Sequence, residues 1–136
     1  MAHLAILLMM HVEHVSVRHT RESISKCAEF AFSCSHFIAA HPRIQPILDE
    51  GRPLDTELWH PIASPHYHLP SELSSAVETL ESLEVEEPKL LNEDNKWLLG
   101  EIYKLRDACN FAIERDLAMV VILSNTLSRP PRRRQK

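Results

Sequence analysis

Three histidines in one proline-rich stretch have the residue type and spacing that best fit metal chemistry. They are His60, His66 and His68, and a tryptophan and a tyrosine lie among them. If the segment is extended, His66 and His68 point to the same side, as two ligands of one ion can, and His60 could supply a third nitrogen. An open fourth position on zinc would permit hydrolysis. A metal-dependent hydrolase is therefore one alternative function.

The rest of the sequence favours a structural or surface role for these histidines. It contains neither a Cys-x-x-Cys pair nor a His-Glu-x-x-His motif, which are strong signs of a zinc site. His11 and His14 flank Glu13, but in a strand their imidazoles would face opposite sides. We therefore predict no cofactor, with zinc as the alternative.

The three cysteines, Cys27, Cys34 and Cys109, form no recognisable catalytic pattern. A nucleophilic thiol needs a nearby base and surroundings that stabilise the thiolate, and the spacing indicates neither. Buried thiols in apolar stripes behave as small apolar residues. We assign no catalytic residue from the sequence.

The composition argues against several classes of function. The net charge is -4, which does not fit a protein that coats nucleic acid, and only the short tail 129–136 is strongly basic. Two glycines far apart cannot form a phosphate-binding loop. No apolar run approaches the length that spans a bilayer, and the odd cysteine count does not fit a secreted disulfide framework. We expect a cytoplasmic protein.

The same proline-rich region, residues 42–70, offers candidate contacts for a protein partner. Trp59 and Tyr67 are the aromatic side chains that dominate interface energetics, and Asp55 and Glu57 could bind a basic partner. Our leading hypothesis is a non-enzymatic binding or regulatory protein that acts through a protein partner. A homodimer that pairs through an exposed apolar helix face is a further alternative.

Hydrophobic periodicity places these residues on a scaffold. Residues 3–17 predict a central strand, with a buried helix as the alternative. Thr20 should cap a helix that runs to about Ala40, because apolar residues recur there at steps of three and four. The region 42–70 should be irregular, apart from one helical turn near 44–48 and a possible short strand.

The second half of the chain gives stronger patterns. Pro70 should begin a helix that ends near Glu84. Asn92 should cap another that ends at 115–116. The apolar run 117–123 predicts a buried strand.

These elements predict a mixed α/β fold in a single globular domain, residues 1–128. The strands near the two ends of the chain should pair at the centre of a small sheet, covered by about three helices. The tail 129–136 has charge and proline but no apolar residue, so we expect it to be disordered.

The order of elements in the second half resembles the YfbM-like family of small bacterial proteins. The resemblance rests on Leu69 to Leu80, on Trp97 to Cys109 and on Ala112 to Leu123. It covers about half of the chain, and the first half has no matching signature. The resemblance implies a mixed α/β fold and assigns no site residues.

Overall fold

A five-stranded antiparallel sheet forms the centre of the protein in a computed structural model, which describes residues 4–86 and 96–124. The order in the sheet is β2-β1-β5-β4-β3. The strands are β1 (Leu4–His11), β2 (Phe30–Ser35), β3 (Arg52–Pro53), β4 (His66–His68) and β5 (Leu117–Leu123). Every neighbouring pair is antiparallel.

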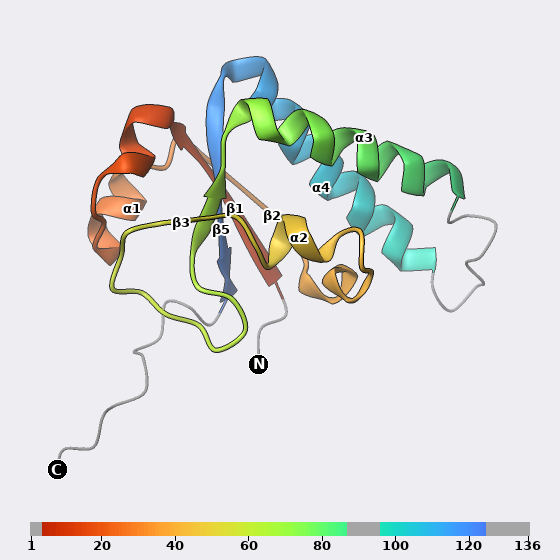
Figure 1. Ribbon diagram of the computed structural model, residues 1–136, viewed down its shortest axis with the longest axis horizontal. Helices are drawn as coiled ribbons and strands as arrows, with labels where there is room; N and C mark the ends of the chain where they lie inside the picture. The colour runs from red at the N-terminus through yellow and green to blue at the C-terminus, as the bar shows by residue number, and fades with distance from the viewer. Residues whose placement is uncertain (1–3, 87–95, 125–136) are drawn as a thin grey trace, which may run out of the picture.

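Helices cover both faces of this sheet unequally. Figure 1 shows α3 and α4 side by side on one side of the strands, with α2 below them, and α1 on the opposite side. The helices are α1 (Arg21–Cys27), α2 (Gln45–Leu48), α3 (Pro70–Glu86) and α4 (Lys96–Arg115), and the 3-10 turns are η1 (Val12–Ser16) and η2 (His36–Ala40). The mixed α/β fold class is thereby confirmed.

Strand β5 lies between β1 and β4, and all seven of its residues are buried. Its neighbour β1 runs from Ala5 opposite Leu123 to His11 opposite Leu117. The predicted central pairing of the two apolar strands is confirmed. The tight return from α4 into β5 passes through Asp116, whose φ of 58° lies in the left-handed region.

The first strand ends earlier than the sequence predicted. Residues 4–11 form β1, but the prediction of a strand to residue 17 is wrong, because 12–16 form the turn η1. Val15 alone is buried in that turn. The alternation of Val12, Val15 and Val17 therefore reflects one inward side chain and two exposed ones.

The predicted helix from Thr20 to Ala40 is also wrong beyond its first turns. Thr20 does cap a helix, with a reciprocal capping box to Ser23, but α1 ends at Cys27. Residues 30–35 then form β2 along the outer side of β1. Phe30, Phe32 and Cys34 alternate as a strand requires, and pairing with β1 outweighs the helical spacing in the same residues.

The second half follows its prediction closely. Helix α3 begins at Pro70, and α4 ends at Arg115. The proposed cap Asn92 and the tail 129–136 lie outside the described residues. No helix within 4–86 and 96–124 is long and apolar enough to cross a membrane.

Two clusters of buried side chains lie on opposite faces of the sheet. The larger one joins α2, α3 and α4 to alternate residues of β1 and β5, and Leu105 and Leu80 are fully buried in it. The smaller one lies under η1, α1 and the loop 54–69, and it includes Met10, Ile24 and Leu58. The predicted irregular region 42–70 therefore contributes to both faces, through α2 on one and Leu54 and Leu58 on the other.

Candidate functional site

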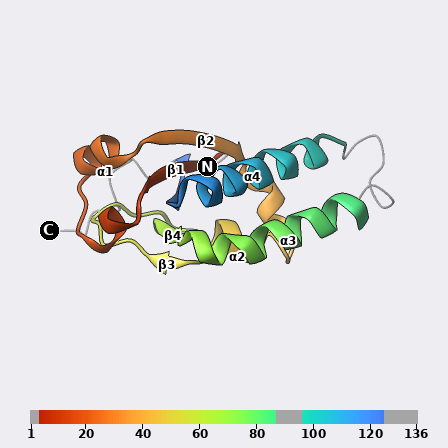
Figure 2. The same ribbon diagram turned by 90° about the horizontal axis from the view of Figure 1, so that it is seen from above.

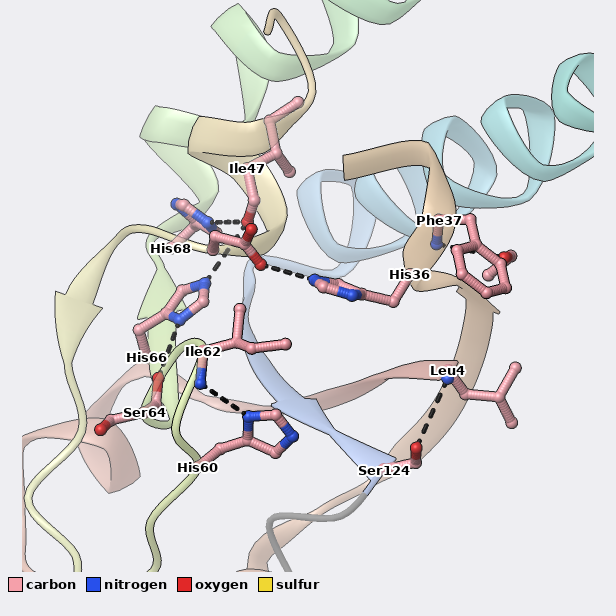
Figure 3. Close-up of polar contacts among 12 residues, drawn as sticks. Leu4, His36, Phe37, Ile47, His60, Ile62, Ser64, His66, His68 and Ser124 are labelled. Atoms are coloured by element: carbon pink, nitrogen blue, oxygen red, sulfur yellow. Dashed lines mark hydrogen bonds and ion pairs between the residues drawn. The ribbon is translucent and has the colours of Figure 1, made fainter. Parts of the chain in front are cut away.

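Four histidines lie together around the end of α2, where the proline-rich region returns to the sheet. Figure 3 shows His66 and His68 from β4 directed toward Ile47 of α2, with His36 and His60 nearby from η2 and the loop. These residues come from elements far apart in sequence. The sequence predicted three of the four histidines as a group and missed His36.

The β4 histidines share one acceptor. Their ring centroids are 5.5 Å apart and nearly perpendicular. His68 Nε2 lies 2.7 Å from the Ile47 carbonyl oxygen, and His66 Nε2 lies 3.4 Å from the same oxygen. The prediction that the two side chains point to the same side is confirmed, as the alternation of a strand requires.

His66 also faces a second carbonyl, because its Nδ1 lies 3.1 Å from the oxygen of Ser64. Two carbonyl oxygens favour a protonated imidazole, whereas burial favours the neutral ring. Burial is the stronger effect and lowers the pKa of His66, and it likewise lowers the pKa of His68. Both rings are therefore neutral near pH 7, and each has one N–H to donate.

His60 is buried, and within the described part of the chain only one of its two ring nitrogens forms a hydrogen bond. Its Nδ1 accepts the Ile62 backbone N–H at 3.1 Å, so the neutral ring carries its proton on Nε2. That Nε2 is buried and has no hydrogen-bond partner among the described residues. Burial, followed by the nearby His36, lowers the pKa of His60.

His36 forms an ion-pair contact that sequence reasoning missed. Its Nε2 lies 2.7 Å from Asp49 Oδ1, and the side chains are only 12% and 14% exposed. Asp49 follows α2 directly, so the short helix sets both the carboxylate and the Ile47 carbonyl. The residue types were visible in the sequence, but nothing in their spacing of thirteen residues linked them.

Gly51 brings the backbone close to the histidine pair. A Cβ at this position would lie 2.6 Å from His66 Cδ2 and 3.1 Å from His68 Cε1. Its φ of 157° is also one that side-chain-bearing residues rarely adopt. The glycine therefore permits the strand β3 to pair with β4 over the imidazoles.

Within 4–86 and 96–124, no group of three or more histidine, cysteine or acidic side chains is arranged to hold a metal ion. His66 and His68 are directed at one carbonyl, and His60 bonds within its own loop. The three predicted ligands are near one another, but each imidazole has its own protein environment. Zinc binding by His60, His66 and His68 stays a prediction.

The loop that carries the predicted partner contacts is fixed at its base. His19 is 1% exposed, its ring lies 2.6 Å from the His14 oxygen, and its backbone N–H donates to the Asp55 carbonyl at 2.8 Å. The Asp55 carboxylate pairs with Arg18 at 2.8 Å. The anchored segment can therefore present neighbouring side chains on a fixed backbone.

A groove of about 500 Å³ lies along this loop. Trp59, which is 39% exposed, and Glu57 line it, and Pro53 and Pro65 lie on its wall. Tyr67 instead packs half-buried against the smaller core. Of the four predicted contact residues, Trp59 and Glu57 thus share one surface, while Asp55 and Tyr67 have structural partners.

The cysteines are placed as apolar residues. Cys34 and Cys109 are buried in the larger core, and desolvation raises the pKa of each thiol to about 12. Such thiols remain protonated at neutral pH and are poor nucleophiles. Cys27 is half-buried beside the smaller core.

Comparisons of the chain with protein-family models, with curated proteins and with solved structures find no match. The resemblance to the YfbM-like family stays a prediction.

Proposed function

We propose that this protein is a non-enzymatic binding protein that holds an extended segment of a partner protein in the groove beside Trp59. The observation that carries the proposal is a large aromatic side chain, 39% exposed, on the wall of a groove of about 500 Å³. Tryptophan is the residue type most enriched among side chains that dominate binding energy. Glu57 in the same groove favours a basic side chain in the bound segment.

The groove is suited to binding because its walls are ordered before a partner arrives. Pro53 and Pro65 restrict the backbone on the wall, and the Leu54 N–H donates to the Pro65 carbonyl at 3.1 Å between them. Leu58, next to Trp59, is buried in the smaller core. A preorganised surface loses less entropy on binding than a flexible loop does.

A displayed library of random peptides, selected on the whole protein, tests the proposal. We expect enriched peptides to contain Lys or Arg, and their binding to weaken about tenfold or more in Trp59→Ala, as for an interface anchor. Trp97→Ala is the matched control, because Trp97 is also exposed, at 48%, but packs near Phe37, away from the groove. In a Trp97→Phe background, Trp59 is the sole tryptophan, and its fluorescence measures binding directly.

Glu57→Gln should reduce the selection for basic residues without changing the thermal unfolding curve, since Glu57 is exposed. Failure to enrich any peptide would contradict the proposal. Equal binding by Trp59→Ala and the wild type would contradict it as well.

A further inference from the structure

Strand β2 is an edge of the sheet with an unusual composition. It pairs only with β1, and Figure 2 shows it as the outermost strand on its side of the molecule. Its sequence, Phe-Ala-Phe-Ser-Cys-Ser, contains no charge, no proline and no glycine. Proteins commonly protect an exposed edge strand with charged residues or proline, because an unprotected edge can pair with another strand.

The outward backbone groups of β2 can be assigned from its neighbour. The Leu4 N–H lies on the β5 side of β1, where it contacts Ser124 Oγ at 3.4 Å. Since the groups of an antiparallel ladder alternate, the odd-numbered residues of β1 bond the even-numbered residues of β2. The N–H and C=O of Ala31 and Ser33 therefore face outward, and no described residue bonds them.

Helix α4 closes one end of this edge and supplies charge along it. The Ser35 N–H, the next outward donor, is already bonded to Glu101 Oε1 at 2.7 Å. At the other end, the Arg115 guanidinium lies 5.6 Å from the centre of the Phe30 ring, which is 43% exposed. The Glu101 carboxylate is also 3.0 Å from Lys104 Nζ, so its charge is already paired within α4.

An aromatic cluster lies between these charges. The Phe111 ring of α4 is 4.7 Å from the Phe30 ring and 4.9 Å from the Phe32 ring. Phe32 lies at the midpoint of the free part of the edge, between Ala31 and Ser33. A two-fold axis at Phe32 would bring two such clusters together.

We propose that β2 pairs antiparallel with β2 of a second copy of this chain, with Ala31 opposite Ser33 of that copy. In this register both Ala31–Ser33 pairs exchange two hydrogen bonds each, and the occupied Ser35 N–H is not needed. Phe30 then lies opposite Cys34 of the second copy. The sheet becomes continuous across the two chains.

This surface differs from the one that the sequence suggested for a homodimer. Helices α3 and α4 bury much of their apolar surface against each other and the sheet, while Trp97 and Tyr103 of α4 are 48% and 39% exposed. The β2 edge is self-complementary in hydrogen bonding and in aromatic contacts. Pairing about a two-fold axis covers the β2 edge of both copies at once.

Sedimentation equilibrium of the full chain at micromolar to high micromolar concentration tests the pairing. We expect a reversible dimer that Ser33→Pro weakens at least tenfold, because proline removes an outward N–H and leaves the β1 bonds intact. Ser33→Ala is the matched control and should dimerise as the wild type does. A wild-type chain that is monomeric throughout would overturn the proposal, as would a folded Ser33→Pro chain that dimerises normally.

A second variant covers the case in which Ser33→Pro fails to fold. Ala31→Pro removes the other outward N–H and should also weaken the dimer at least tenfold, with Ala31→Ser as its matched control. A folded Ala31→Pro chain that dimerises as the wild type does would overturn the register. The groove beside Trp59 lies at a different place on the chain, so peptide binding can fail or succeed independently.

Discussion

The two faces of the central sheet are covered by different kinds of structure. On one face, two long helices interlock over a continuous apolar core. On the other, a short helix, a 3-10 turn and the loop 54–69 bury a smaller set of side chains. The first face combines this packing with histidine contacts at α2, such as that of His68 with the Ile47 carbonyl, whereas on the second face the buried His19 bonds the turn to α1.

This difference teaches where the chain can present a surface for binding. A face covered by interlocked helices leaves little freedom for new contacts. A loop that covers a face anchors itself with some side chains and can expose others. Leu58 is buried, for example, and its neighbour Trp59 is exposed. The proposed binding groove lies on the second kind of cover.

Removing a core side chain from each face should produce the largest difference. We expect Leu105→Ala to lower the free energy of unfolding by about 2–5 kcal/mol, since interlocked helices collapse poorly into a cavity. Leu58→Ala should cost about 2 kcal/mol or less, because the loop above it can settle inward. Urea unfolding followed by circular dichroism measures both. An equal decrease in unfolding free energy in the two variants would mean that the helices and the loop are equally rigid around these side chains.

Crowding the histidine region should have the next largest effect. Gly51→Ala places a Cβ against His66, and we expect it to cost about 1–3 kcal/mol through overpacking. Gly100→Ala is the matched control, because its Cβ would meet no atom within 4 Å on the exposed side of α4. That control should stabilise the protein by up to about 1 kcal/mol. A neutral Gly51→Ala variant would show that β3 and β4 yield easily.

The smallest predicted effect is a dependence of stability on pH. The pKa values of His60, His66 and His68 are lowered in the folded state, so the unfolded chain binds more protons under acid conditions. Their contribution to stability is complete above the ordinary histidine pKa of about 6.5 and is lost as pH falls below it. Urea midpoints measured from pH 7.5 to 5 should therefore decrease.

His68→Gln isolates one part of that slope. A glutamine amide can donate to the Ile47 carbonyl in place of the imidazole N–H but does not titrate. Above pH 7 the stability of the variant should depend on pH as that of the wild type does. Below pH 6.5 the variant should lose less stability than the wild type. An identical acid slope in both proteins would remove His68 from this account.

The sequence predicted the second half of the fold because each segment there fits the hydrophobic period of only one kind of element, helix or strand. Leu98, Ile102 and Leu105 repeat as a helix and not as a strand, and 117–123 is too short and too apolar for an exposed element. In residues 20–40 the two periods coincide. Cys34 fits a helix stripe through Ile38 and also alternates with Phe32, and only pairing with β1 decides between them.

The candidate sites were predictable in part for the same reason. The common direction of His66 and His68 follows from local strand geometry. The Ile47 acceptor and the His36–Asp49 pair depend on where a four-residue helix docks, which no local pattern encodes. Trp59 was predicted from its residue type. Its groove, however, is lined by Pro53 and Pro65, which are twelve residues apart and come together only in the folded chain.

The pairing of β1 with β5 also has a consequence for how the chain acquires its structure. These strands join Ala5 to Leu123, so the central ladder closes almost the whole described chain into one loop. Contacts of such long sequence separation slow folding, because their entropy must be lost before they give any stabilisation. During synthesis the apolar strand β1 must wait for β5 to leave the ribosome. Its run of leucine and methionine is the segment we expect chaperones to hold until then.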